Sequence, residues 1–152
     1  MEVERLKAFD LFCGVCAELS GYIYQMKNII EAHRYIDNAK EILRDKAQKE
    51  DSRYHDRKYV RMAGHTAYLA ILVALDGLFG IKKKGRKKVE WYQEQLAKLD
   101  KKMLNSFLNA YEILHLGMGY DGDLSAAIAH EGLKEAEKII NWVETKQEVI
   151  SA

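Results

Sequence analysis

The stretch YVRMAGHTAYLAILVALDGLFG, residues 59–80, decides the fold of this chain. Between Val60 and Leu78, apolar or small residues recur at spacings of three and four, which is the repeat of one helix face. Most of the neighbouring positions are apolar too, and many side chains are small enough to let another helix approach closely. The stretch therefore predicts the most buried helix of a bundle, ended by Gly77 and Gly80.

Similar stripes lie on both sides of this stretch. Residues 28–50 carry apolar positions at the same spacings, and a polar segment, residues 49–56, connects them to the central helix. Farther along, the side chain of Asp100 suits a helix N-cap and divides residues 89–114 into two helices, with one long helix as the alternative. We expect the glycine-rich residues 117–123 to form a turn, and Ser125 to cap a last helix.

The composition agrees with one all-helical domain. The chain has 152 residues, 48% of them hydrophobic and 31% charged, and it contains no proline, so long helices can run unbroken. We predict an antiparallel bundle of four or five helices over residues 26–146. A helical extension, residues 1–25, precedes it and is either an appended helix or the product of an early start. A short tail, residues 147–152, follows it.

No feature of the sequence indicates a membrane or secreted protein. The N-terminus mixes acids and bases, and no apolar run is long enough to span a bilayer. The only two cysteines, Cys13 and Cys16, exclude the disulfide framework of a small secreted domain. We therefore expect a cytoplasmic protein.

Several short motifs lack the partners that their chemistry requires. Cys13-Gly-Val-Cys16 has the spacing of a zinc or redox site, but no second ligand pair and no preceding strand accompany it. Glu112 and His115 have the spacing of a di-iron motif, which requires a second copy and two more glutamates. Residues 121–132 begin like a calcium loop and then lack its glycine and its final glutamate. We expect no metal and no cofactor.

Charge is distributed unevenly although the net charge is only +1. Residues 53–102 hold 13 Lys and Arg against 5 Asp and Glu, a balance of +8, whereas residues 118–152 hold 3 against 7, a balance of −4. Such a chain presents a basic face to an anionic partner or pairs with a copy of itself.

One basic segment lies in the positive half. Its basic residues are Lys82, Lys83, Lys84, Arg86, Lys87 and Lys88. A solvated loop that keeps the protein soluble is one interpretation, and contact with a phosphate backbone is the other. No aromatic residue interleaves with these charges, which argues against base stacking on the loop itself.

Two histidines are the weak candidates for catalysis. His65 follows Arg61 by four residues on one face of the central helix, and Arg57 lies near the same surface. His115 belongs to a later helix. A hydrogen-bonded packing role is the alternative for a histidine in an apolar helix.

Four stretches together resemble a known family: AKEILRDKA, HTAYLAILVALDGLF, LNAYEILHLGMGYDG and AIAHEGLKEAEKIINWVE, at residues 39–47, 65–79, 108–122 and 127–144. They resemble the HEPN-like bundles and, still more closely, a helical domain of unknown function found mainly in Bacteroidota. The resemblance covers about residues 27–145. It implies an antiparallel bundle that often dimerises through helix faces, and an apolar face left exposed along residues 60–78 would favour such a dimer.

The same resemblance bears on activity. Some HEPN proteins are metal-independent ribonucleases, in which four to six residues separate an arginine from a histidine near the start of a late helix. His115 lies in that neighbourhood, but no arginine follows Arg86, and Arg61 and His65 are spaced too closely. The sequence therefore favours a non-catalytic, homodimeric binding or assembly module, with RNA or a nucleotide as the candidate ligand of the basic loop. A divergent ribonuclease that uses His115 or His65 with Arg57 or Arg61 is the alternative.

Overall fold

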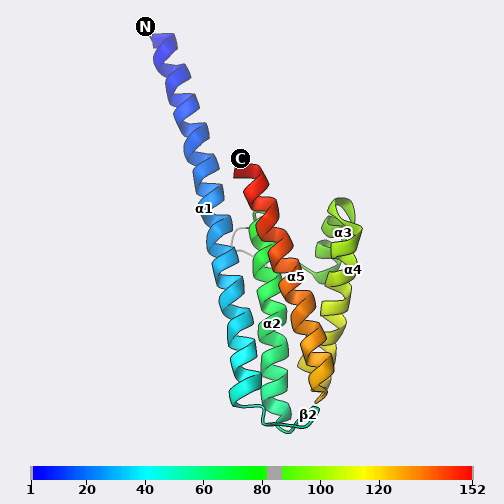
Figure 1. Cartoon of the computed structure of the whole chain (residues 1–152). Coiled ribbons are helices and arrows are strands. Elements are labelled where there is room, and N and C mark those ends of the chain that lie inside the picture. The colour runs from blue at the N-terminus through cyan, green and yellow to red at the C-terminus, as the bar shows by residue number, and fades with distance from the viewer. Residues whose placement is uncertain (1, 82–86, 152) are drawn as a thin grey trace.

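The computed structural model describes residues 2–81 and 87–151 of the chain, and the side chains of residues 14–81 and 87–149. In chain order the elements are α1 (Glu2–Asp45), β1 (Lys49–Glu50), β2 (Arg53–Tyr54), α2 (Arg57–Leu78), α3 (Val89–Leu99), α4 (Lys101–Ala110), the π-helix η1 (Tyr111–Asp121) and α5 (Ala126–Ser151). The helices stand side by side along one long direction (Figure 1). The predicted all-helical bundle is confirmed.

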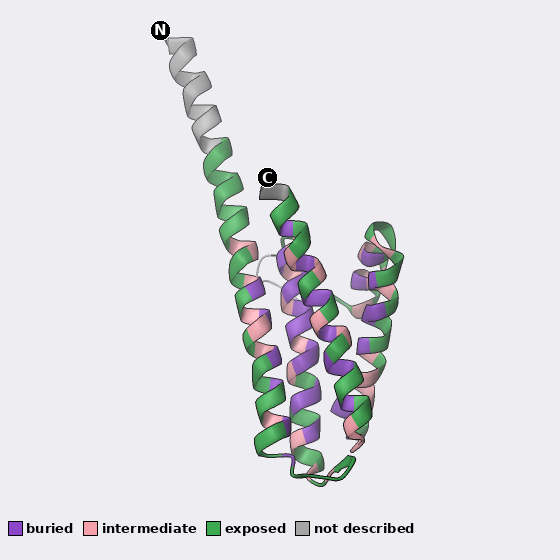
Figure 2. Ribbon diagram, viewed as in Figure 1, coloured by how far each residue is buried: buried purple, intermediate pink, exposed green. Residues whose placement is uncertain are grey.

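Helix α2 is the packing centre of the bundle. It contacts α1, η1 and α5, and its apolar stripe is buried along most of its length (Figure 2). Full burial of a side chain such as Ile71 stabilises the fold by about 1.5–3 kcal/mol. The bundle itself covers the stripe that the sequence singled out, so Val60, Ala67, Ile71 and Ala74 belong to the core.

Side-chain caps begin α2 and α4, and the second of them was predicted from the sequence. Asp56 accepts a hydrogen bond from the Lys58 backbone N–H at 3.0 Å and starts α2. Asp100 accepts from the backbone N–H groups of Lys102 and Met103, at 2.8 and 3.2 Å, and separates α3 from α4. The predicted division at Asp100 is therefore confirmed. Each such cap contributes about 1 kcal/mol.

A small hairpin closes the corner between α1 and α2. Strands β1 and β2 pair antiparallel, with Lys49 opposite Tyr54. The Tyr54 N–H donates to the Leu124 carbonyl at 2.8 Å, and the Ala126 N–H donates to the Ser52 carbonyl at 3.0 Å. These bonds hold the predicted polar connection against the start of α5 and so fix the end of the bundle next to η1.

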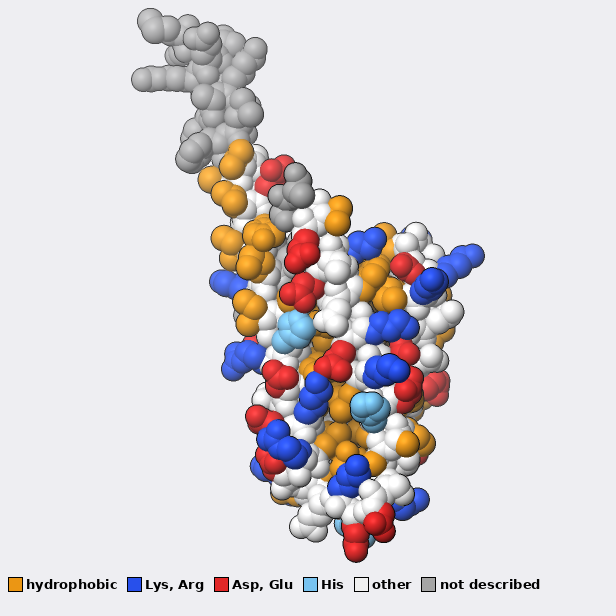
Figure 3. Space-filling view, in the orientation of Figure 1, with side chains coloured by type: hydrophobic (Ala, Val, Ile, Leu, Met, Phe, Trp, Pro, Cys, Tyr) orange, Lys and Arg blue, Asp and Glu red, His pale blue; other side chains and the backbone are white. Residues whose placement is uncertain are grey.

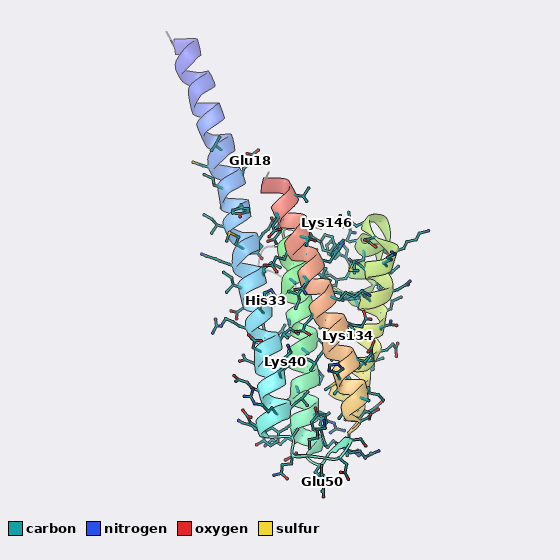
Figure 4. The ribbon with its side chains drawn as sticks, viewed as in Figure 1. Glu18, His33, Lys40, Glu50, Lys134 and Lys146 are labelled. Atoms are coloured by element: carbon teal, nitrogen blue, oxygen red, sulfur yellow. The ribbon has the colours of Figure 1, made fainter. Side chains whose placement is uncertain are left out.

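Helix α1 is continuous from Glu2 to Asp45 and passes residue 25 without a break. Its burial against the bundle starts at Ile29. From there it runs beside α5, where His33 contacts Glu144 at 3.3 Å and Lys40 donates to Glu137 at 2.5 Å (Figure 4). Helix α5 likewise continues through residue 147 to Ser151. In the described part of the chain, no helix is long and apolar enough to cross a membrane.

The two glycines predicted to end the central helix have different roles. Gly80 follows α2 with φ +65°, a left-handed conformation that favours glycine. Gly77 lies within α2, where an added Cβ would come within 2.8 Å of the Asn28 Cβ. Its role as a helix end is therefore corrected: it is small because α1 passes close to it.

Candidate functional site

Helix α2 presents a row of polar and aromatic side chains beside its apolar stripe. Arg57, Arg61, His65 and Tyr68 follow one another at spacings of four, four and three, so they share one face of the helix. The first three are exposed and Tyr68 is buried. Since this face packs against η1, the row borders the contact between the two helices.

Across from this row lies the π-helix η1, which covers the eleven residues Tyr111–Asp121. A π-helix bonds each residue to the fifth along the chain, and such segments are rare and frequently found at functional sites. The prediction that residues 117–123 form a turn is therefore wrong for most of its length. The helix ends only at Gly122, which has φ +69° and lies in the left-handed region.

Four aromatic rings surround the imidazole of His115. Its centroid lies 4.8 Å from that of Tyr68, 5.2 Å from Tyr111, 5.5 Å from Tyr120 and 5.8 Å from His65. The rings of His65 and Tyr120 are 6.2 Å apart. The structure thus brings together His65 and His115, the two histidines singled out in the sequence, and adds three tyrosines.

Glycines on both helices allow this close approach. A Cβ on Gly64 would lie 2.6 Å from the Met118 Cβ, and a Cβ on Gly119 would lie 2.7 Å from Cε1 of His65. A Cβ on Gly122 would lie 2.5 Å from Cγ of Arg57. Gly119 and Gly122 therefore leave room for the side chains of α2, and Gly122 also ends the helix.

The surroundings of His115 disfavour its protonated form. Burial lowers its pKa below the ordinary value of 6.5, and the neighbouring His65 lowers it further. The buried Nδ1 atom has no hydrogen-bond partner among the described residues. His115 is therefore a neutral imidazole near pH 7, with an unsatisfied ring nitrogen inside the cluster.

The two arginines of the row carry charges that the described residues leave unpaired. Neither Arg57 nor Arg61 has a carboxylate within 4.0 Å in the described part of the chain, whereas Arg34 and Arg44 each have one. The Nε atom of Arg61 lies 3.0 Å from the position that a Gly122 Cβ would take. Two guanidinium groups therefore flank the end of η1, next to the histidines.

Other predicted site residues lie elsewhere. Lys82, Lys83, Lys84 and Arg86 fall outside the described residues, and Lys87 and Lys88 are exposed before α3. The Lys87 ammonium lies 5.9 Å from the ring centroid of Trp91, an aromatic partner that the sequence had not indicated. The loop begins beyond the end of α2, roughly 20 Å of helix rise from His65.

Two further motifs of the sequence can be placed in the structure. Cys16 is exposed on α1, and no group of three or more metal-ligating side chains occurs among the described residues. Asp123 accepts a hydrogen bond from the Ser125 N–H at 2.8 Å, and the Ser125 hydroxyl accepts from the Ile128 N–H at 3.4 Å. The predicted helix cap at Ser125 is confirmed.

Sequence reasoning missed Tyr120 and Tyr111 as members of the site. It assigned Tyr120 to a turn, whereas its side chain is 65% exposed and borders both histidines. Tyr111, His115 and Tyr120 are spaced four and five residues apart. In an α-helix, the side chains of Tyr111 and Tyr120 would therefore point to opposite sides. The only available signal was the unusual density of glycine and aromatic residues in this segment.

Comparison with known proteins gives a family but no activity. The chain matches the model of a family described as "Domain of unknown function (DUF5618)" over residues 27–145. A solved structure, a protein of unknown function from Dyadobacter fermentans, is 56% identical, with a TM-score of 0.76; the match covers 80% of this chain and 97% of that one. No curated protein matches.

Dyadobacter belongs to the Bacteroidota, so the predicted resemblance to an uncharacterised Bacteroidota family is confirmed. The likeness to HEPN bundles stays a prediction. Because the family model covers most of the chain, the chain belongs to the DUF5618 family of domains of unknown function.

Proposed function

We propose that this chain is a non-catalytic, HEPN-like binding and assembly module of the cytoplasm, which works as a homodimer and binds RNA or a nucleotide. The observation that carries the proposal is the row of Arg57, Arg61 and His65 beside the imidazole of His115. The ligand site is therefore assigned to the contact between α2 and η1, with the basic loop as a second phosphate contact.

The charges of this row suit a phosphate. Arg57 and Arg61 have no carboxylate within 4.0 Å among the described residues, so their donors are available to an anion. Guanidinium groups bind phosphate oxygens through paired N–H donors, and a protonated imidazole adds further donors. An anion bound beside His115 would offset the effect of burial on the pKa of that histidine, so binding should strengthen as the pH falls.

The exposed ring of Tyr120 adds a surface for a base. It is 65% exposed, lies against His65 and His115, and comes two residues before Gly122, beside which Arg57 and Arg61 lie. Bases of single-stranded nucleic acids stack on exposed aromatic rings, at about 1–3 kcal/mol per base. A site with cations for the phosphate and a ring for the base favours a nucleotide unit over a simple anion.

The test is the affinity for a fluorescent single-stranded RNA, measured by anisotropy over a series of salt concentrations. In the Arg57→Ala, Arg61→Ala double variant we expect weaker binding and a salt dependence flatter by roughly 1.4 in the logarithmic slope, since two phosphate contacts are lost. The matched control is Lys101→Ala with Lys102→Ala, which removes two exposed charges from α4.

A third variant separates the two basic sites. Replacement of Lys83, Lys84 and Arg86 by alanine should flatten the slope further if the loop also contacts phosphates. RNA affinity that is unchanged in both the arginine variant and the loop variant would contradict the proposal, as would equal losses in the α4 control.

A divergent ribonuclease is the second candidate, favoured by the two imidazole rings 5.8 Å apart. One histidine as base and one as acid is chemically reasonable at neutral pH, with Arg61 or Arg57 opposite the phosphate charge. The proposal predicts no cleavage of RNA by the wild-type chain. Cleavage that disappears in the His65→Ala, His115→Ala double variant would overturn it in favour of the enzyme.

A further inference from the structure

The part of α1 before the bundle carries an apolar stripe that its own chain leaves uncovered. Six large apolar side chains between residues 15 and 30 are 38–57% exposed: Val15, Leu19, Tyr22, Ile23, Met26 and Ile30. At about 100° per residue they occupy one face of the helix, separate from the face that packs into the bundle. Hydrophobic side chains gather along this part of α1 in Figure 3.

Residues 14–23 of α1 are helical although the rest of the chain covers little of their surface. Every residue from 14 to 23 is exposed, and only Tyr22 among them lines the groove beside the end of α5. The segment also contains Gly14 and Gly21, and a glycine inside a helix costs about 1 kcal/mol relative to alanine. Since most helical stability in proteins comes from packing of an apolar face, we expect a surface outside the chain to stabilise this stretch.

We propose that the stripe between residues 15 and 30 of α1 is the homodimer interface, paired antiparallel with the same stripe of a second copy. The inference rests on the homodimer of the proposed function and names its surface. It is independent of the ligand site at α2 and η1.

The order of the apolar positions fits an antiparallel pair about a twofold axis. When the axis passes between residues 22 and 23, every apolar side chain of the stripe meets another apolar side chain of the second copy. The resulting layers are Val15 against Ile30, Leu19 against Met26, and Tyr22 against Ile23. A twofold interface uses the same patch on both copies, which this arrangement satisfies.

The available area matches a small specific interface. Six half-exposed apolar side chains offer roughly 100 Å² each, so two copies would bury roughly 1,200 Å², the lower limit for specific protein interfaces. A shallow groove continues the stripe, where Tyr22, Met26 and Ile30 meet Gln147 and Glu148 near the end of α5. The copies should therefore form a dimer that dissociates on dilution.

Light scattering over a concentration series tests the interface with the full chain. We expect the wild type to approach twice the 17.5 kDa chain mass as concentration rises. Leu19→Glu should raise the dissociation constant at least about tenfold, because each dimer loses two buried leucines and gains two buried charges. The control is Ala17→Glu, an equally exposed position on the opposite side of the helix.

The outcomes separate the two proposals. A wild type that stays at 17.5 kDa at all concentrations overturns the homodimer and its interface together. A wild-type dimer that Leu19→Glu leaves intact overturns only the interface. Circular dichroism and thermal unfolding of both variants check that the bundle stays folded, as expected because residues 17 and 19 are exposed and lie outside its core.

Cysteine crosslinking tests the direction of pairing. In a background with Cys13 and Cys16 replaced by serine, a mixture of the Leu19→Cys and Met26→Cys chains should crosslink under mild oxidation faster than either chain alone. In the antiparallel pair, the two copies of position 19 lie about 10 Å apart along the helix axis, too far for a disulfide, and the same holds for position 26. Faster crosslinking of each variant with itself would indicate parallel pairing and overturn the antiparallel interface.

Discussion

The contact between α2 and η1 and the free part of α1 have similar helical spacing in the sequence and opposite surroundings in the structure. In the first region, glycines on both helices bring the backbones so close that an added Cβ would meet its neighbours at 2.5–2.7 Å. In the second region, Gly14 and Gly21 have nothing within 4 Å. The same spacing of apolar residues therefore belongs to a buried helix face in the first region and to an exposed face in the second.

The difference also separates the two proposed roles. The α2 and η1 contact places charged and aromatic side chains at its border, with Arg61, His65 and Tyr120 open to solvent. The free part of α1 offers mainly large apolar side chains. The first surface suits a small charged ligand, and the second suits another helix.

The two regions should differ most in the stability lost when one leucine of each is replaced by alanine. Leu114 on η1 is fully buried, whereas Leu19 on α1 is 54% exposed. Leu114→Ala should lower the free energy of unfolding by about 2–5 kcal/mol, because it leaves a cavity in the core. Leu19→Ala, measured by urea unfolding at a concentration where the chain is monomeric, should change it by less than about 0.5 kcal/mol. Similar losses for both would contradict the comparison.

Glycine substitutions should act in opposite directions in the two regions. Gly64→Ala puts a methyl group 2.6 Å from the Met118 Cβ and 2.7 Å from the Leu114 carbonyl oxygen, and should cost about 1–3 kcal/mol. Gly21→Ala meets open space and should stabilise the chain by up to about 1 kcal/mol. Thermal unfolding measures both, and a stabilising Gly64→Ala would show that the two helices are not packed this closely.

A smaller effect concerns the pH dependence of stability. The pKa of His115 is lowered in the folded chain, so the unfolded chain takes up a proton more readily as the pH falls. Its contribution to stability is therefore present above pH 6.5, the ordinary value, and is lost as the pH falls below it. His115→Phe keeps an aromatic ring among Tyr68, Tyr111, Tyr120 and His65. In this variant the urea unfolding midpoint should depend less on pH between about pH 7.5 and 5.5.

The control is His130→Gln, which removes an exposed histidine of α5 and leaves the rings around His115 in place. A wild-type urea midpoint that rises as the pH falls over this range would contradict the prediction that folding lowers the pKa of His115.

The sequence predicted the bundle because its helix signals are local. The caps at Asp100 and Ser125 and the buried stripe of α2 each depend on residues a few positions apart. The π-helix was missed because its glycines are typical of a turn, and only the packing of Gly64 and Gly119 against η1 and α2 shows why they are small. The site depended on contacts between distant segments, so His65 and His115 were identified one by one but not as neighbours.

The central claim is that the contact between α2 and η1 holds the phosphate-bearing ligand. Its most direct test is an NMR titration of the full chain with adenosine monophosphate, observing the histidine ring and arginine side-chain signals. The account predicts saturable shifts of Arg57, Arg61, His65 and His115, with the Arg34 and Arg44 signals unchanged. Shifts confined to other residues, or no saturable shift at all, would contradict it.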